Sequence, residues 1–232
     1  HSATMVKLGV YLLWRFNSLI PILDLLVLLG AVTMLISSLR ALIEDDLKKL
    51  LAYTTIASLG LLVSLVGKQA FDSASVFFLT HVFYKGALFM LLGCFYLGIK
   101  TTKLAEIGSP FRYGTMVGCA TLLSLFSMLG VPPILGFFGK EFVLKEILKF
   151  ESPLQDYILL VGLLLSVAVG FKVIFKTFFS KNKQQVILPK YISFFASALT
   201  LGSIFIPIFS KYFFGFGLWH GFNYVVVASL VL

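Results

Sequence analysis

The chain consists of long apolar runs that are joined by short polar connections. Most runs approach the roughly 20 apolar residues that a helix needs to cross a bilayer. They are continuous, whereas membrane-spanning β-strands would alternate apolar and polar residues. Helices also satisfy their own backbone hydrogen bonds in lipid. The pattern therefore predicts an all-α polytopic membrane protein, a bundle of about eight transmembrane helices near residues 1–14, 24–39, 50–67, 73–99, 113–148, 154–175, 191–210 and 218–232.

The fifth run is interrupted by two adjacent prolines. Pro132 and Pro133 remove two backbone donors and bar a straight helix, and Gly130 and Gly136 flank them. We predict one discontinuous crossing over 113–148, with a non-helical break at these residues. A broken helix at membrane depth is tolerated where protein encloses it or where it lines a wet cavity, and such breaks mark transport sites. A re-entrant loop without a transport role is the alternative.

Composition excludes several classes of protein. Hydrophobic residues make up 59% of the 232 residues and charged residues 12%, with a mean hydropathy of +1.00, whereas soluble domains carry about 25% charged residues. The net charge of +9 does not indicate nucleic-acid binding, because that requires a polar, basic face. Cys94 and Cys119 lie in apolar runs, and no cysteine–histidine cluster predicts a zinc or iron–sulfur site. We expect no metal and no cofactor in this chain.

Basic residues in the polar connections suggest an orientation. If 113–148 is one crossing, the connections at 40–49, 100–112 and 176–190 share one side and carry more lysine and arginine than the other side. This predicts that they face the cytoplasm or matrix. The basic residues of that side are Arg40, Lys48, Lys49, Lys100, Lys103, Arg112, Lys176, Lys181, Lys183 and Lys190, against Arg15, Lys68, Lys145, Lys149 and Lys211 on the other.

Lys85 lies near the middle of the fourth run, too far from either end to reach water. A charged lysine at the bilayer centre costs roughly 2.5–3.5 kcal/mol. His81 precedes it by one helical turn and faces the same way, and Thr80 and Tyr84 add polar groups. Burial disfavours the ammonium form, so proton release becomes feasible. We interpret the group as part of an ion path; hydrogen bonds that only hold helices together are the alternative.

Lys140 follows the break and is adjacent to Glu141, which can pair with Lys145 four residues on. The combination of a break, an intramembrane lysine and an acid favours a transport site over a plain loop. Lys172 lies near the end of its run, and we expect it to extend to the lipid headgroups. Lys7 lies in the first run, which ends near Trp14 and is too short for a full crossing, so the chain is expected to be part of something longer.

Four ordered stretches resemble one family, the antiporter-like subunits shared by respiratory complex I and the multisubunit Mrp cation/proton antiporters. They are HSATMVKLGVYLL at 1–13, DDLKKLLAYTTIASLG at 45–60, THVFYKGALFMLLG at 80–93 and GVPPILGFFGKEF at 130–142. Within the family, GKE at 139–141 and LWHGFN at 218–223 look more like the Mrp A subunit than the large distal chain of complex I.

The resemblance implies a larger fourteen-helix core with two inverted five-helix repeats, each with one broken helix. Lys140 matches the lysine of a broken helix, Lys85 a central-axis lysine, His81 a histidine beside it, and His1 a histidine that links the two halves. Glu141 stands where many complex I relatives carry aspartate. The implied organisation is a single transmembrane domain over 1–232, with a truncated first helix at 1–16, a five-helix repeat at 22–178 and following helices at 190–232.

These observations predict one half-channel of a multisubunit Na+/H+ antiporter in the bacterial inner membrane. Protons would pass from His1 through Lys85 and His81 toward Lys140, with Glu141 on the path and Lys7, Thr80 and Tyr84 as secondary polar groups. The expected partners are protons, Na+, lipid, an upstream antiporter-like half and small Mrp subunits. The first alternative is a proton-pumping subunit of complex I. It would be part of an enzyme in the mitochondrial inner membrane, and its partners would be the other membrane-arm subunits. A purely structural subunit is the second.

Overall fold

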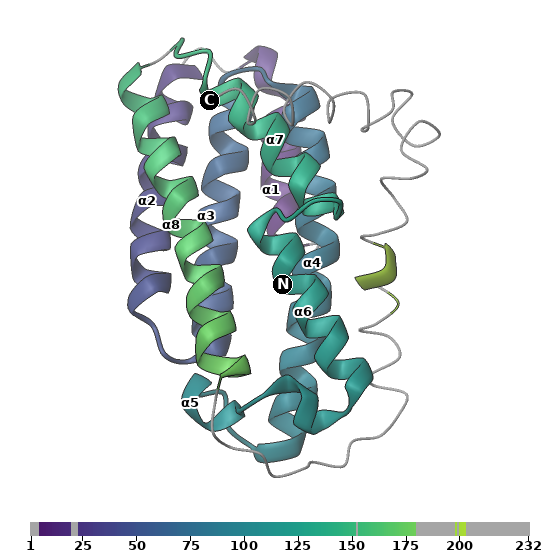
Figure 1. Ribbon diagram of the computed structural model, residues 1–232. Helices are drawn as coiled ribbons and strands as arrows, with labels where there is room; N and C mark the ends of the chain where they lie inside the picture. Colours follow the sequence, from purple (N-terminus) through teal and green to yellow (C-terminus); the bar gives the residue numbers. More distant parts are fainter. Residues whose placement is uncertain (1–4, 20–22, 152, 180–197, 199, 203–232) are drawn as a thin grey trace, which may run out of the picture.

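The computed structural model describes residues 5–19, 23–151, 153–179, 198 and 200–202, and this part of the chain is a helical bundle (Figure 1). Its helices are α1 (Met5–Arg15), η1 (Asn17–Leu19), α2 (Leu23–Ile43), α3 (Leu47–Gly67), α4 (Phe71–Ile99), α5 (Leu104–Ile107), η2 (Pro110–Tyr113), α6 (Thr115–Leu129), α7 (Leu135–Ile147) and α8 (Pro153–Phe178). The predicted all-α fold is therefore confirmed. The predicted runs at 191–210 and 218–232 lie almost entirely outside the described residues.

Four helices of the described part are long and apolar enough to cross a membrane: α2, α3, α4 and α8, with 21, 21, 29 and 26 residues. Each coincides with a run predicted from the sequence. The α2–α3 connection, the short helices α5 and η2, and the last turn of α8 lie together at one end of the bundle (Figure 1). The structure therefore confirms that the basic connections at 40–49 and 100–112 share an end, as the count of crossings required.

The interrupted crossing is built from α6 and α7, which lie one after the other along α4 (Figure 1). With 15 and 13 residues, they would each span about 20 Å at 1.5 Å per residue, less than a hydrocarbon core of about 30 Å. Helix α6 ends where Gly130 adopts φ 84°, a conformation that a Cβ would disfavour. Val131 donates its amide hydrogen to the Phe126 carbonyl at 3.0 Å. The predicted break is thus confirmed.

Small residues let α2 and α3 approach closely. A Cβ at Gly60 would lie 2.6 Å from the Gly30 carbonyl oxygen and 2.8 Å from the Met34 amide nitrogen. The Ser64 hydroxyl donates to the Val27 carbonyl across the same interface at 2.9 Å. Backbone atoms cannot yield as a flexible side chain can, so the contact fixes α3 in register with α2. Helix α3 also carries the oxygen atoms that bind the Lys85 ammonium. The close contact between α2 and α3 therefore helps to position these oxygen atoms.

Gly60→Ala should lower the free energy of unfolding by about 1–3 kcal/mol, because the added methyl meets backbone atoms and forces the two helices apart. Gly93→Ala is the matched control: Gly93 is exposed on α4, and a Cβ there meets nothing within 4 Å. That change should be neutral or slightly stabilising, since alanine favours helix by about 1 kcal/mol over glycine. Thermal unfolding of the detergent-solubilised parent protein measures both. Equal unfolding temperatures for the two variants would contradict the proposed register contact.

A clasp of Asp45, Lys172 and Lys176 joins the α2–α3 connection to α8. The Asp45 carboxylate lies 2.6 Å from Lys176 and 3.2 Å from Lys172. The Lys172 ammonium also donates to the carbonyls of Leu42 and Glu44, at 2.8 and 2.5 Å. The expectation that Lys172 extends to lipid headgroups is therefore wrong, because its ammonium is taken up by carbonyls at the end of α2. A cation there complements the helix C-terminus.

Acid should open this clasp. The hydrogen bonds from Lys176 and then from Lys172 lower the pKa of Asp45 below its ordinary value of 3.8. A carboxyl whose pKa is depressed in the folded state contributes stability above its unfolded pKa and loses it as pH falls through the folded pKa. The unfolding temperature should therefore decrease as the pH is lowered below about 4. Asp45→Asn should remove part of this dependence of the unfolding temperature on pH. Glu106→Gln, at an exposed helix-surface pair with Lys103, is the control and should leave it unchanged.

Candidate functional site

Lys85 occupies the middle of α4 and is completely buried. Its ammonium donates to the Leu51 carbonyl at 3.1 Å and to the Thr54 hydroxyl, both on α3. Thr54 and Thr55 in turn donate their hydroxyls to carbonyls one turn earlier, at 2.8–3.2 Å. Because these threonines bond backward along α3, their oxygen atoms remain available as acceptors. The site therefore receives the ammonium on oxygen atoms of a neighbouring helix and not on a carboxylate.

His81 lies one turn before Lys85 and is also completely buried. Its ring stands edge-on to the Tyr84 ring at 5.4 Å and near the Phe77 ring at 6.1 Å. Among the described residues, neither ring nitrogen has a hydrogen-bond partner. Lys7 of α1 is buried as well, with its ammonium 5.2 Å from the Phe78 ring, and its charge acts on His81 and Lys85. Three titratable groups thus lie together in the bundle interior.

Lys140 reaches back across the break. It lies in the second turn of α7, and its ammonium donates to the Leu129 carbonyl, the last residue of α6, at 3.2 Å. The side-chain stem runs against Gly130, where a Cβ would lie 2.8 Å from the Lys140 Cδ. At Gly136 a Cβ would collide with the Ser127 carbonyl. The glycines of the motif therefore let α6, α7 and the lysine stem come together at the break.

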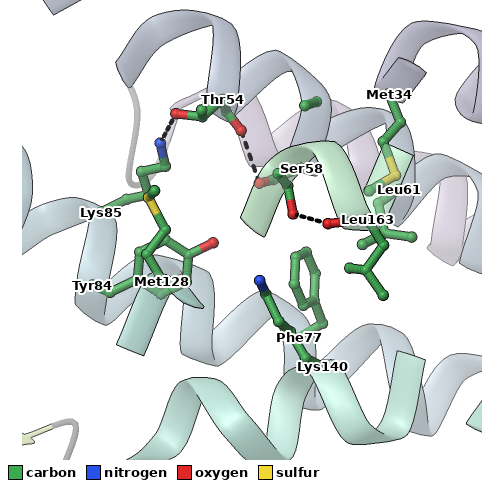
Figure 2. A pocket seen from close by; sticks show the side chains of 12 residues that line it. Met34, Thr54, Ser58, Leu61, Phe77, Tyr84, Lys85, Met128, Lys140 and Leu163 are labelled. Atoms are coloured by element: carbon green, nitrogen blue, oxygen red, sulfur yellow. Dashed lines mark hydrogen bonds between the residues drawn. The ribbon is translucent and has the colours of Figure 1, made fainter. Parts of the chain in front are cut away.

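Lys85 and Lys140 border the same small cavity, of about 20 Å3. Figure 2 shows the Lys140 ammonium and the Tyr84 hydroxyl pointing into the space between α3, α4 and α7, with Lys85 and Thr54 at its far side. The remaining lining residues are Met34, Ala57, Ser58, Leu61, Phe77, Met128, Leu163 and Ser166. Two lysines from separate crossings are therefore brought to one space in the bundle interior.

Several predicted site residues lie away from this cavity. Glu141 forms an ion pair with Lys145 at 2.7 Å, as the spacing predicted, with its own side chain 4% exposed. Thr80 donates to the Phe77 carbonyl at 2.8 Å and packs against Gly139 of α7. Neither lines the cavity, and neither do His81 and Lys7. His1 lies outside the described residues.

Sequence reasoning missed two features of the interior. Lys68, counted above as a loop charge, forms an ion pair with Asp156 at 2.8 Å, and both side chains are almost completely buried, at 2% and 0% exposure. Lys68 caps the C-terminus of α3, and Asp156 lies in the first turn of α8. Each charge is therefore opposite in sign to the partial charge of the helix end beside it, which is favourable. Ser58 and Ser166 at the cavity were the other omission. For the Lys68–Asp156 ion pair, the one available signal in the sequence was an acid, Asp156, at the start of an apolar run.

The arrangement suits proton transfer. Two lysine ammonium groups around one cavity repel each other in a low-dielectric interior, so charging one disfavours charging the other. The Thr54 hydroxyl stabilises the Lys85 ammonium, and the Leu129 carbonyl stabilises the Lys140 ammonium. Neither oxygen neutralises the positive charge, whereas a carboxylate would. Among the residues that the structure describes, no group of three His, Cys, Asp or Glu side chains could hold a metal ion. The chemistry that these side chains support is acid–base exchange between amines.

Similar proteins are found among subunits of membrane complexes. The chain is 32% identical over 221 residues to NADH-ubiquinone oxidoreductase chain 5 of Hypocrea jecorina, covering 92% of this chain and 32% of that one. It is 28% identical to a Staphylococcus saprophyticus protein named as antiporter subunit mnhA2, covering 100% of this chain and 36% of that one. The chain therefore spans about a third of the length of the curated relatives it matches.

Solved structures and a family profile agree with these relatives. An Mrp complex from Dietzia sp. DQ12-45-1b matches with a TM-score of 0.77 and 25% identity, over 90% of this chain and 24% of the matched chain. Respiratory complex I from Thermus thermophilus shares the fold, with a TM-score of 0.79 and 23% identity over 91% of this chain and 47% of that one. The profile of the NADH:quinone oxidoreductase/Mrp antiporter transmembrane family matches residues 2–167. This chain is a membrane protein that belongs to that family.

Proposed function

We propose that this chain supplies one half-channel for protons in a multisubunit Na+/H+ antiporter of the bacterial inner membrane. The observation that carries the proposal is the meeting of Lys85 and Lys140, from two separate crossings, at one cavity in the bundle interior. A structural subunit has no need of a buried ammonium such as that of Lys85, which no carboxylate among the described residues neutralises, because that charge costs free energy in the membrane. The likeness to an antiporter subunit and to an Mrp complex supports the assignment.

The proposed path begins at His1 and runs through His81 and Lys85 to Lys140. Tyr84 lines the cavity between the lysines, while Lys7 and Thr80 act as secondary polar groups. Glu141 follows Lys140 on α7, forms an ion pair with Lys145, and would continue the path beyond Lys140. In this proposal residues 22–178 form one five-helix repeat, and α6 and α7 are its broken helix. The end with more basic residues faces the cytoplasm.

A subunit of respiratory complex I in the mitochondrial inner membrane is the second candidate. It is favoured by the 32% identity to chain 5, against 28% to the antiporter subunit. The side-chain chemistry of the cavity is the same in both cases, and the difference lies in the source of energy. Electron transfer in partner subunits would drive the complex I subunit. An ion gradient would drive the antiporter, and its electrical part is worth about 2.3 kcal/mol per charge per 100 mV of membrane potential.

The composition and activity of the intact assembly test the proposal. The parent protein is purified with its partners from native membranes and reconstituted in sealed vesicles with a pH-sensitive dye inside. We expect small membrane subunits without flavin or iron–sulfur centres, and proton movement that depends on a Na+ gradient. Flavin, iron–sulfur centres and NADH-driven proton movement would favour the second candidate. An assembly that moves no protons under either condition would contradict both.

A further inference from the structure

Helix α8 is joined to α2 and α3 by charged contacts near both of its ends. Lys68 of α3 meets Asp156 where α8 begins, and the clasp described above meets the last two turns of α8. We propose that Lys68 and Asp156 are a positioning pair: they fix α8 along its axis, and through α8 they fix the cavity and the carbonyl that binds Lys140. This inference rests on the proposed function, which places Lys140 on an ion path.

The pair is enclosed and directional. The Lys68 ammonium contacts both oxygen atoms of the Asp156 carboxylate, at 2.8 and 3.1 Å, and both side chains are almost completely buried. If one partner moved away, the other would be left as a buried charge without compensation, which is strongly unfavourable. The pair therefore permits little sliding of α8 against the end of α3. Neither residue lines the cavity, so any effect on the site has to pass through α8.

The packing around α8 does not fix its axial position by itself. Apolar helices gain little from apolar contact in lipid, because lipid tails are equally apolar. Among the four long helices of the described part, α8 is the least enclosed, with 33% of its apolar stretch buried against 67% for α3. A Cβ at Gly162 would lie 3.0 Å from Met34 Cγ, and one at Gly170 would lie 2.6 Å from Leu129 Cδ2. Both neighbours are flexible side chains that can yield when α8 moves, unlike the backbone atoms between α2 and α3.

The same stretch of α8 forms part of the site. Leu163 and Ser166 line the cavity. Gly170 packs on Leu129, whose carbonyl accepts a hydrogen bond from Lys140 at 3.2 Å. A displacement of α8 by one residue would move these groups by about 1.5 Å, and a misplacement of about 1 Å can cost a hundredfold in rate. The axial position of α8 therefore bears directly on the groups around Lys140.

Stability alone does not explain a buried ion pair at this place. Two charges lose their hydration there, and apolar residues of similar volume often stabilise a fold equally well or better. What an ion pair adds is direction, because its charged atoms have to stay within hydrogen-bonding distance. The clasp lies at the opposite end of the bundle (Figure 1), roughly 24 Å further along α8 at 1.5 Å per residue. Directional contacts thus hold the helix near both of its ends.

Removing both charges of the pair separates positioning from stability. The Lys68→Met, Asp156→Leu double variant of the intact assembly should unfold at or above the wild-type temperature, yet its proton uptake in sealed vesicles should fall about tenfold. A role in stability alone predicts that uptake follows the unfolding temperature. Lys68→Arg, which keeps a cation opposite Asp156, should retain most of the uptake. Wild-type uptake by the double variant, or loss of the assembled complex, would overturn the inference.

A matched control removes the same charges from the same end of the bundle. Glu146 and Lys149 border one polar surface pocket together with Lys68, but they pair with each other three positions apart in the chain. The Glu146→Leu, Lys149→Met double variant should transport as wild type does. If Lys85→Met stops transport while the Lys68→Met, Asp156→Leu variant matches wild type, the positioning role is wrong and the proposed function stands. If Lys85→Met transports normally, the proposed function itself fails.

The position of α8 can also be observed directly. A high-resolution density map of the assembly with the Lys68→Met, Asp156→Leu variant should show α8 displaced along its axis relative to α3, by about the 1.5 Å rise of one residue. The hydrogen bond from Lys140 to the Leu129 carbonyl should be lengthened or lost in the same map. An α8 that keeps its wild-type position in this variant would overturn the inference.

Discussion

Replacing Lys85 by methionine should reduce proton transport by at least about a hundredfold, while the subunit still folds and assembles. Methionine keeps most of the length of the side chain but removes the group that binds and releases a proton, and general acid–base groups contribute about 10²–10⁴-fold in rate. Folding should survive, because a buried ammonium carries a desolvation cost that methionine does not. The oxygen atoms that lose the ammonium keep other partners: Thr54 still bonds to Leu50 and Leu51, and Leu51 still accepts from Thr55.

The measurement is the initial rate of proton uptake in vesicles, normalised to the amount of assembled complex. Lys103→Met is the matched control, since Lys103 has a side chain that is 71% exposed and only a surface contact with Glu106 at 3.6 Å. It should transport as wild type does. Wild-type uptake by Lys85→Met would show that the buried ammonium has no part in transport. Loss of the assembled complex would instead show that Lys85 holds α4 against α3.

Much of this bundle could be predicted because the bilayer imposes it. A continuous apolar run must become a helix in lipid, so α2, α3, α4 and α8 followed from composition and length. The break followed from chemistry at two prolines, which cannot continue a helix. Lys85 was recognisable for the same reason, since a charge at the centre of such a run needs an explanation. Each of these signals is local to one segment of the chain.

The remaining features depend on which helices become neighbours, and no single segment carries that information. Ser58 and Ser166 are ordinary residues of apolar runs until α3 and α8 place them at one cavity. Lys172 looked like an interfacial lysine, yet the α2 C-terminus lies within its reach at 2.8 Å. Lys68 looked like a loop charge, but Asp156, 88 positions further along the chain, buries it. Long-range pairing decided all of these cases.

Arginine at position 140 should fail as completely as methionine at position 85, although it preserves the positive charge. A guanidinium does not release its proton in proteins, so position 140 of the proposed proton path would stay charged. A permanent charge there would also oppose protonation of Lys85 across a shared low-dielectric space. We therefore expect at least about a hundredfold loss of proton uptake for Lys140→Arg, with the assembled complex present.

Bulk and proton release can be separated by a second variant. The Lys140 stem runs against Gly130, so a guanidinium could fail through size alone. Lys140→His is smaller and titrates near neutral pH, and it should keep more activity than Lys140→Arg, with an optimum at lower pH. Lys149→Arg is the matched control and should be silent, since the Lys149 side chain is half-exposed and pairs with Glu146 away from the cavity. Full uptake by Lys140→Arg would show that charge alone suffices and that this lysine does not switch its proton. Equal loss in Lys140→Arg and Lys140→His would contradict a proton switch at this position and leave the bond from Lys140 to the Leu129 carbonyl, at 3.2 Å, as the role of this lysine.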